Sequence, residues 1–253
     1  MDRIEEIRDK IGQCDDNIIE QLVARMRCIQ DIIEYKKEKG IPILQPEQEK
    51  KQEDNLKRKL GDNPFEEEML DIFKYIVKNS RRIQAKALFN YNIFLIGFMG
   101  AGKSTVAREL KKQLEMNYVE MDQLIVEQRG MAITDIFEEY GETYFRNLES
   151  NVLIELQKRK QTIVSCGGVR EDNKDHMKKN GRVVFLTATP NTVYERVKNS
   201  TERPILNNNM NVEFISQLLE KRRALYEEAA DITVATDGKS VSEICDEIVS
   251  ELI

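Results

Sequence analysis

The sequence predicts a multidomain protein, with an all-helical domain over residues 1–90 and an α/β domain over residues 91–253. Three observations lead to this prediction. Apolar residues recur at steps of three and four in the first part of the chain, which is typical of amphipathic helices. After residue 90, short β-rich runs alternate with helical stretches, which indicates a parallel sheet wrapped by helices. The phosphate-binding pattern G-x-x-x-x-G-K-S follows the first of these runs.

The first domain begins with an unusually long helix. Apolar residues keep helical spacing from Ile4 to Ile33, so we expect one amphipathic helix of roughly 35 residues. It should end near Gly40-Ile41-Pro42, because glycine and proline terminate helices. Two shorter helices, over 46–60 and 64–88, cover little of its apolar seam. We therefore expect a second chain to pack along the first helix.

The second domain should contain a five-stranded parallel sheet. Its expected strands are the short apolar runs at 92–96, 117–121, 162–165, 182–187 and 232–236. The helical stretches between them are long enough for the crossovers that parallel strands need.

Composition limits the function. Lys and Arg number 39 and Asp and Glu 45, giving a net charge of -6, which argues against a nucleic-acid binder but permits a local basic pocket. Four cysteines lie far apart without a C-x-x-C pair, which favours reduced thiols in the cytoplasm over a disulfide framework or zinc site. No signal-peptide core and no membrane-length apolar run is present, so we expect no membrane partner.

The phosphate-binding pattern occupies Gly97–Ser104, between an apolar strand and a helical run. Glycines allow backbone N–H groups to curl around phosphate oxygens, and the following helix adds a favourable dipole. Lys103 would reach the β- and γ-phosphates, and Ser104 would be a ligand of Mg²⁺. The alternative is a chance glycine-rich turn, which the order of strand, motif and helix disfavours.

Several segments downstream suggest what receives the phosphoryl group. Glu120 and Asp122 end the second strand, beside the loop in a doubly wound sheet. The segment GETYFRNLES supplies Arg146 and Glu149, and IVSCGG closes the third strand. Two further arginines follow in basic settings, in ERPIL and KRRALYEEA.

Together these segments resemble the shikimate kinase family, within the nucleoside-monophosphate-kinase-like P-loop proteins. GFMGAGKST, EMDQLI, GETYFRNLE, CGGV, RPI and RRALY occur here in the family's order. The resemblance implies transfer of phosphate from ATP, with Mg²⁺, to the 3-hydroxyl of shikimate. Asp122 would bind the shikimate hydroxyls and orient or deprotonate the attacking one. The catalytic set it implies is Lys103, Asp122 and Arg203.

The resemblance also assigns binding residues. Arg146 and Arg222 would hold the carboxylate with the backbone of Gly167 and Gly168, and Glu149 would orient Arg146. Arg203 would sit on a mobile lid, and Arg196 would lie against adenine. Ser104 and Glu120 would hold the metal. The full ATP set would be Gly97, Gly100, Ala101, Gly102, Lys103, Ser104, Thr105, Arg196 and Arg203.

Two positions depart from the family pattern. Glu120 replaces the first aspartate of D-x-D, and its longer carboxylate can still hold a water on Mg²⁺. Val169 replaces a third glycine, and the chain reaches Arg170 sooner than in the family. Because only glycine freely accepts positive φ, we expect a reshaped loop and an altered substrate grip.

The first ninety residues resemble the all-helical chorismate mutase family (the AroQ class). The matching segments are IEEIRDKI, LVARM, EYKKEKGIPIL and IVKNSRRIQ. The family is an intertwined homodimer that rearranges chorismate to prephenate. The chorismate-binding residues it implies are Arg8, Arg25, Lys36, Glu49, Ser80 and Gln84. Arg25, Lys36 and Gln84 would be catalytic, by binding the compact conformer and stabilising charge on the breaking C–O bond.

Helix geometry tests part of this set independently. Arg25 and Lys36 are three turns and about 16 Å apart on one face, so their long side chains can converge on a ligand. Arg8 precedes Arg25 by about 25 Å and lies on another face. Arg8 must therefore come from a partner chain or be unrelated to the site, and the family's dimer donates the equivalent arginine across the interface.

Alternatives remain open. Gln45 and Gln48 stand where the family has an aspartate and an arginine, which removes charge and should weaken the mutase. The helical domain would otherwise be a dimerisation module, or a sensor of chorismate or prephenate that gives feedback. The second domain would otherwise be another small-molecule kinase of the same fold. His176, the one histidine, lies in a polar stretch and is expected at the surface, not as a base.

Overall fold

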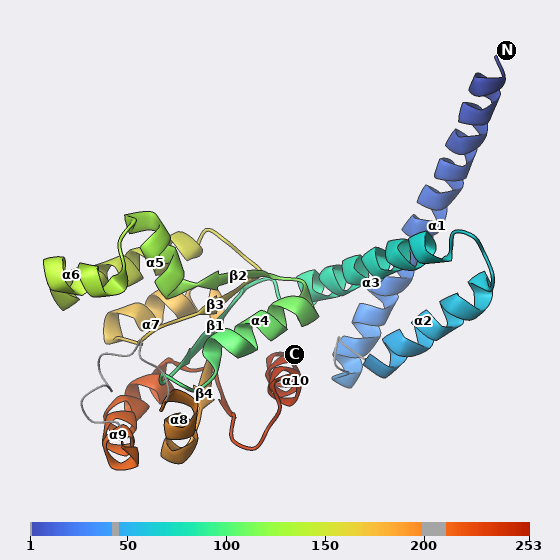
Figure 1. Cartoon of the computed structure of the whole chain (residues 1–253). Coiled ribbons are helices and arrows are strands. Elements are labelled where there is room, and N and C mark those ends of the chain that lie inside the picture. The colour runs from blue at the N-terminus through green and yellow to red at the C-terminus, as the bar shows by residue number, and fades with distance from the viewer. Residues whose placement is uncertain (1, 42–45, 199–210) are drawn as a thin grey trace. The chain divides into compact units, whose positions relative to one another are not determined.

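The structure is a computed structural model that describes residues 2–41, 46–198 and 211–253 (Figure 1). The chain divides into two compact units, Met1–Leu88 and Phe89–Ile253. Two residues singled out from the sequence, Gln45 and Arg203, lie outside the described residues, as does the lid on which Arg203 was expected.

The first unit is helical. It consists of α1 (Arg3–Lys39), α2 (Pro46–Leu60) and α3 (Glu66–Leu88). The predicted end of α1 is confirmed, because Gly40 adopts a left-handed φ of 61° and its N–H bonds to the carbonyl of Lys36. The predicted start of α3 at residue 64 is wrong by two residues. The Asn63 side chain accepts the N–H of Phe65 at 2.9 Å, which forms a turn before the helix begins.

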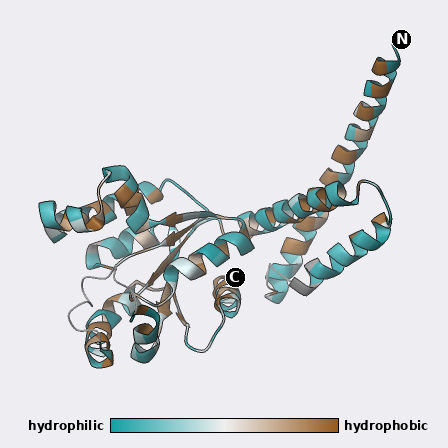
Figure 2. Cartoon of the chain, viewed as in Figure 1, coloured by the Kyte–Doolittle hydropathy of each residue, from teal (hydrophilic) through white to brown (hydrophobic). Residues whose placement is uncertain are grey.

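Much of the apolar face of α1 is uncovered by its own chain. Ile29 and Ile33 are buried near the C-terminal end of the helix. Toward the N-terminus, Ile11 is 56% exposed and Ile19 is 59% exposed, although both keep the helical spacing of a buried stripe. Figure 2 shows apolar positions recurring along α1.

The second unit contains the predicted five-stranded sheet. All neighbouring strands pair in parallel, in the order β2-β3-β1-β4-β5. The strands are β1 (Asn92–Gly97), β2 (Asn117–Glu120), β3 (Thr162–Ser165), β4 (Gly181–Thr187) and β5 (Ile232–Ala235). They agree with the predicted runs to within one residue at each end.

Helices connect and cover these strands (Figure 1). They are α4 (Lys103–Leu114), α5 (Met121–Arg129), α6 (Ile133–Leu156), α7 (Glu171–Lys178), α8 (Pro190–Val197), α9 (Val212–Ala229) and α10 (Val241–Leu252). Phe94 and Ile96 of β1 point into a core with α5, α6, α7 and α9, while Ile93 and Leu95 alternate to the other face and are also fully buried. Both faces of the sheet are therefore covered, as parallel sheets require.

The strand order places the functional loops together. β1 lies between β3 and β4. The chain places β2 and β3 on one side of β1, and then β4 and β5 on its other side. Ligands of such sheets bind at the carboxyl ends of the strands beside this switch point. The ends of β1, β3 and β2 carry Gly97, Ser165 and Glu120, which precede the segments predicted to bind substrates.

Candidate active sites

The phosphate-binding loop connects β1 to α4. Two of its glycines leave no room for a side chain. A Cβ on Gly97, whose φ is 145°, would lie 2.4 Å from the carbonyl oxygen of Leu186. A Cβ on Gly100 would lie 2.8 Å from Val197 Cγ1. The loop can therefore approach a phosphate closely only with glycine at these positions.

The charged and hydroxyl groups of the loop already face inward. Lys103 Nζ donates to the carbonyl oxygens of Gly97 at 2.9 Å and Phe98 at 3.0 Å. Ser104 Oγ lies 3.3 Å from Ser165 Oγ at the end of β3. Ala101, in the loop before α4, is buried. Thr105, which follows Ser104 on the first turn of α4, is exposed. The first turn of α4 thus presents a cation and a hydroxyl beside its own N-terminus.

Arg196 spans from α8 to the loop. Its Nη1 donates to the carbonyl oxygen of Gly100 at 3.1 Å and to Thr236 Oγ1 at 3.0 Å. Its Nη2 donates to the Thr236 carbonyl oxygen at 3.2 Å. The guanidinium plane is thus held between the phosphate loop and the segment after β5, where it can lie against a nucleotide base.

Glu120 ends β2 in register with Ser165, the neighbour of Ser104. Its carboxylate accepts a hydrogen bond from Tyr118 at 2.6 Å, and burial together with this bond raises the pKa of Tyr118 to about 12. No group of three or more His, Cys, Asp or Glu among the described residues could hold a metal. Ser104 and Glu120 supply the oxygen donors that Mg²⁺ prefers, and fit an ion that is also bound by phosphate oxygens.

The predicted acceptor-binding residues gather around the two glycines after β3. A Cβ on Gly167 would lie 3.1 Å from Glu149 Oε1 and 3.2 Å from Asp122 Oδ1. A Cβ on Gly168 would lie 3.7 Å from Arg146 Nη1. Asp122 belongs to the first turn of α5 and not to the strand end predicted from the sequence, because β2 stops at Glu120. Two carboxylates thus lie against Gly167, where a Cβ would push them back slightly, and a guanidinium lies beside Gly168.

Arg146 is held by carboxylates on its own helix, α6. Its Nη1 donates to Glu149 Oε2 at 2.8 Å, and its Nε and Nη2 donate to Glu142 Oε1 at 3.2 and 3.0 Å. Burial alone would lower the pKa of Arg146, but these two carboxylates outweigh it and raise the pKa. The guanidinium therefore stays charged and fixed in direction.

Glu149 is only 1% exposed, and its Oε1 has no hydrogen-bond partner among the described residues. Burial raises its pKa, although the hydrogen bond from Arg146 opposes the rise. A carboxyl with a raised pKa binds its proton more tightly in the folded state. It therefore makes folding less favourable as pH rises from its ordinary value of 4.5 through the raised value.

Glu149→Gln should remove this pH dependence. Relative to wild type, the variant is expected to gain stability as pH rises above 4.5, with a slope of at most about 1.4 kcal/mol per pH unit. Urea denaturation of both proteins from pH 4 to pH 8 measures the difference. Parallel stability curves would contradict the burial argument.

A cavity of about 390 Å³ opens beside this cluster. Its lining includes Arg146, Gly168 and Arg222 of the predicted carboxylate site, together with Glu142, Thr143, Val169, Arg170 and Leu225. The Arg222 guanidinium also lies 6.0 Å from the ring centroid of Phe98 in the phosphate loop. Sequence reasoning missed Glu142 and Arg170, although the shortened segment after Gly168 was a signal for Arg170.

The first unit joins four of its predicted site residues in two pairs. Arg25 of α1 donates from Nη1 to Ser80 Oγ of α3. Lys36 Nζ of α1 donates to Gln84 Oε1 of α3 at 3.3 Å. The two cations are separated by three turns of α1, whereas their partners are one turn apart on α3. Their side chains therefore converge. Burial lowers the pKa of Arg25, and Lys36 is 8% exposed.

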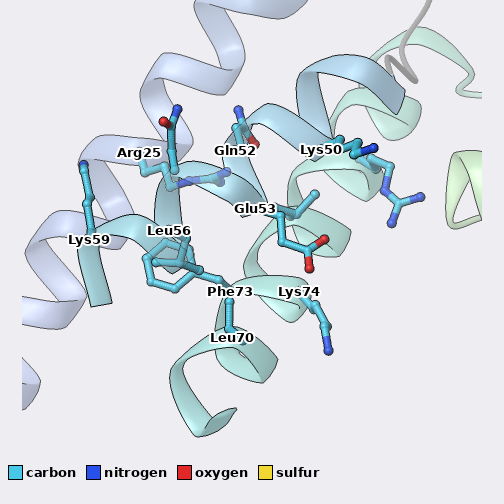
Figure 3. A pocket seen from close by; sticks show the side chains of 12 residues that line it. Arg25, Lys50, Gln52, Glu53, Leu56, Lys59, Leu70, Phe73 and Lys74 are labelled. Carbon is cyan, nitrogen blue, oxygen red and sulfur yellow. The ribbon is translucent and has the colours of Figure 1, made fainter. Parts of the chain in front are cut away.

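A second cavity, of about 640 Å³, opens between the three helices (Figure 3). Arg25 reaches it from α1, Lys50, Glu53 and Lys59 from α2, and Lys74 from α3. Arg81, next to Ser80, also lines it. The cavity carries five cations and one carboxylate, which suits an anionic ligand. Among the predicted residues whose side chains the structure describes, Arg25 lines this cavity, whereas Lys36, Ser80 and Gln84 do not.

Arg8 is not brought to these pairs within one chain. Arg8 is exposed, about 25 Å along α1 from Arg25. Glu49 lies on α2, and Gln48 beside it is exposed. Within one chain, Arg8 cannot contact a molecule that Arg25 holds.

The surface position expected for His176 is wrong. The residue is half-buried on α7, where its Nδ1 lies 3.1 Å from Gln157 Nε2. The same amide group donates to the His176 carbonyl oxygen at 3.3 Å. The polar sequence around His176 concealed this contact with α6.

In the parts of the chain that the structure describes, no helix combines the length and apolar character that a membrane crossing requires.

The fold and the site in the second unit define a P-loop kinase for a small carboxylated acceptor. A family model for shikimate kinase matches residues 99–253, and one for chorismate mutase type II matches residues 7–85. The chain belongs to the shikimate kinase family and carries a chorismate mutase type II domain ahead of the kinase. The predicted bifunctional enzyme is thereby confirmed.

Similar proteins agree with this assignment. The chain is 43% identical over 164 residues to a shikimate kinase from Sulfurihydrogenibium sp., covering 64% of this chain and 97% of the relative. It is similar to the structure of shikimate kinase from Acinetobacter baumannii in complex with shikimate, with a TM-score of 0.61, 33% identity, and coverage of 65% and 94%. The Aquifex aeolicus shikimate kinase gives a TM-score of 0.56, 37% identity, and coverage of 64% and 95%.

Proposed function

We propose that the second unit phosphorylates the 3-hydroxyl of shikimate through the residues gathered at the carboxyl ends of β1, β2 and β3. The observation that carries this proposal is the grouping of Asp122, Arg146 and Gly167 beside the phosphate loop. Asp122 orients the attacking hydroxyl and accepts its proton. Arg146 and Arg222 bind the carboxylate, while Glu149 fixes Arg146. The similar Acinetobacter enzyme was solved with shikimate, which supports this acceptor.

The donor side uses positioning and charge more than covalent chemistry. Lys103 exchanges its loop carbonyl partners for β- and γ-phosphate oxygens, and Arg196 lies against adenine. Ser104 and Glu120 would hold Mg²⁺, which when bound neutralises the developing phosphate charge. Arg203 would approach the transferring phosphoryl group.

The first unit binds chorismate with Arg25, Lys36, Ser80 and Gln84, joined by Glu49. The two cations of α1, which are paired with Ser80 and Gln84 of α3, support this assignment. A buried ammonium can stabilise negative charge on the ether oxygen as the C–O bond breaks, and no metal or nucleophile is required.

We also propose that two chains associate along α1. The exposed apolar stripe of α1 costs free energy in water and is relieved when a second copy covers it. Arg8, which is too far from Arg25 of its own chain, would then enter the partner's site. The family's intertwined dimer has this arrangement.

Co-expression of two inactive variants tests this shared site. Arg8→Ala and Arg25→Ala chains should each lack mutase activity as homodimers. If the site takes Arg8 from the partner, random pairing gives half heterodimers with one intact site each, and about a quarter of wild-type activity returns. The matched control pairs wild type with the Arg8→Ala/Arg25→Ala double variant, which should also give about a quarter. No mutase activity in the first mixture, together with about half of wild-type activity in the control mixture, would contradict the proposal.

Two assays on the purified full chain test the activities themselves. With ATP present, the enzyme should form ADP when shikimate is added, but not when gluconate or a nucleoside monophosphate is added. Chorismate should lose its absorbance. A chain inert toward shikimate would defeat the kinase assignment. A chain that binds but never consumes chorismate would leave the first unit as a sensor or dimerisation module.

The cysteines support a cytoplasmic location. All four are free thiols, Cys14 and Cys28 exposed and Cys166 and Cys245 buried. Free thiols persist in reducing compartments.

A further inference from the structure

The connection from β3 to α7 is short. β3 ends at Ser165 and α7 begins at Glu171, so five residues, Cys166–Arg170, cross the mouth of the site. Val169 is buried in the core that α6 and α9 also form. Because Val169 anchors the backbone there, the half-buried Arg170 side chain starts from a fixed point two residues after Gly168.

Arg170 faces the same cavity as the two arginines already assigned to the carboxylate. The cavity is lined by Arg146, Arg170 and Arg222 together with one acidic residue, Glu142. Gly168, whose Cβ position lies 3.7 Å from Arg146 Nη1, belongs to the same wall. Three arginines on three elements, α6, the β3–α7 connection and α9, thus line one space of about 390 Å³.

The charges around the cavity show why a third cation matters. Arg146 is bonded to two carboxylates, Glu142 and Glu149. Asp122 beside Gly167 adds a third carboxylate to the cluster, against the two positive charges of Arg146 and Arg222. Arg170 brings the cluster to three positive and three negative charges, so it offsets part of the repulsion that these carboxylates exert on a bound carboxylate. Arg170 also opposes the rise in the pKa of Glu149 that burial causes, which places the guanidinium within electrostatic reach of the cluster.

We propose that Arg170 is a third carboxylate-binding residue of the kinase site, which favours acceptors that bear a carboxylate. The inference rests on the proposed kinase function. The shortened connection brings Arg170 to the cavity in place of the longer glycine-rich loop, so the altered loop strengthens the grip on the substrate instead of weakening it. A guanidinium suits this role, because it stays charged and can donate two parallel hydrogen bonds to a carboxylate.

Steady-state kinetics of the full chain test the proposal. Arg170→Ala should raise the KM for shikimate about 10-fold to 100-fold, the range for a lost charged hydrogen bond, and change kcat less than about threefold. The KM for ATP should not change. Arg223→Ala is the matched control, because Arg223 lies beside Arg222 on α9 but is exposed and bonded to Glu227. It should keep wild-type constants.

Methyl shikimate separates charge recognition from pocket shape. Its inhibition constant should change less than about twofold in Arg170→Ala, because an ester has no charge for the guanidinium to bind. An unchanged shikimate KM, or equal weakening of the acid and the ester, would overturn the proposal. Arg170→Gln carries the same comparison if Arg170→Ala does not fold. A wild-type chain without shikimate-dependent ADP release would instead defeat the proposed function.

Discussion

Asp122→Asn should lower kcat for shikimate phosphorylation by about 100-fold to 10,000-fold, the usual contribution of a positioned general base. The amide keeps the size of the side chain and can still bind a hydroxyl, but it cannot accept the proton. Asp122 Oδ1 lies against Gly167, within the group that includes Glu149 and Arg146. The KM for ATP should therefore remain near the wild-type value. ADP release at saturating ATP and varied shikimate gives both constants.

The control for this substitution is Asp135→Asn. Asp135 also lies in the first turn of a helix, α6, but it is exposed. Loss of a helix-terminal charge is therefore matched between the two variants. Asp135→Asn should keep wild-type kcat. If Asp122→Asn were as active as this control, Asp122 would not be the base.

Lys36→Met is expected to lower chorismate mutase activity by about 100-fold to 1000-fold. This is the usual effect of removing one preorganised hydrogen-bond donor that stabilises the negative charge developing in the transition state. Methionine retains the apolar stem length and removes the ammonium that donates to Gln84 Oε1. The kinase activity of the same preparation should be unchanged. Chorismate consumption and ADP release, measured on one sample, make the comparison internal.

Lys37→Met is the matched control, because Lys37 is the next residue of α1 and is exposed. Thermal denaturation of both variants shows whether packing has changed, since a buried lysine can destabilise the fold even when it aids the reaction. Retained mutase activity in Lys36→Met would assign Lys36 a structural role beside Gln84. Equal losses in Lys36→Met and Lys37→Met would point to damage of the whole helix.

The sequence predicted the elements well where local signals were strong. The β-rich runs gave all five strands, since parallel strands buried on both faces read as continuous apolar segments. Gly40 marked the end of α1 because its left-handed conformation is a local property. The start of α3 was predicted too early, because the turn that the Asn63 side chain forms competes with helix formation.

The sites were predicted less completely. Motif spacing identified Arg146 and Glu149, which are one turn apart and bonded directly. Arg170 was missed because its role depends on the anchoring of Val169 in a core that no local pattern reveals. His176 was misplaced for the same reason, since its contact with Gln157 joins two helices. The cavity among Arg25, Glu53 and Lys74 likewise requires three helices to be placed.

The uncovered length of α1 makes the two halves of this chain respond differently to dilution. The second unit buries a hydrophobic core of its own, so we expect its stability not to depend on concentration. In the proposed dimer, the free energy that holds α1 in place falls by about 1.4 kcal/mol for each tenfold dilution. Each chain carries one kinase site and one mutase site. The dimerisation equilibrium, however, would determine what fraction of the mutase sites is intact. The ratio of mutase to kinase turnover would then report the abundance of the protein itself.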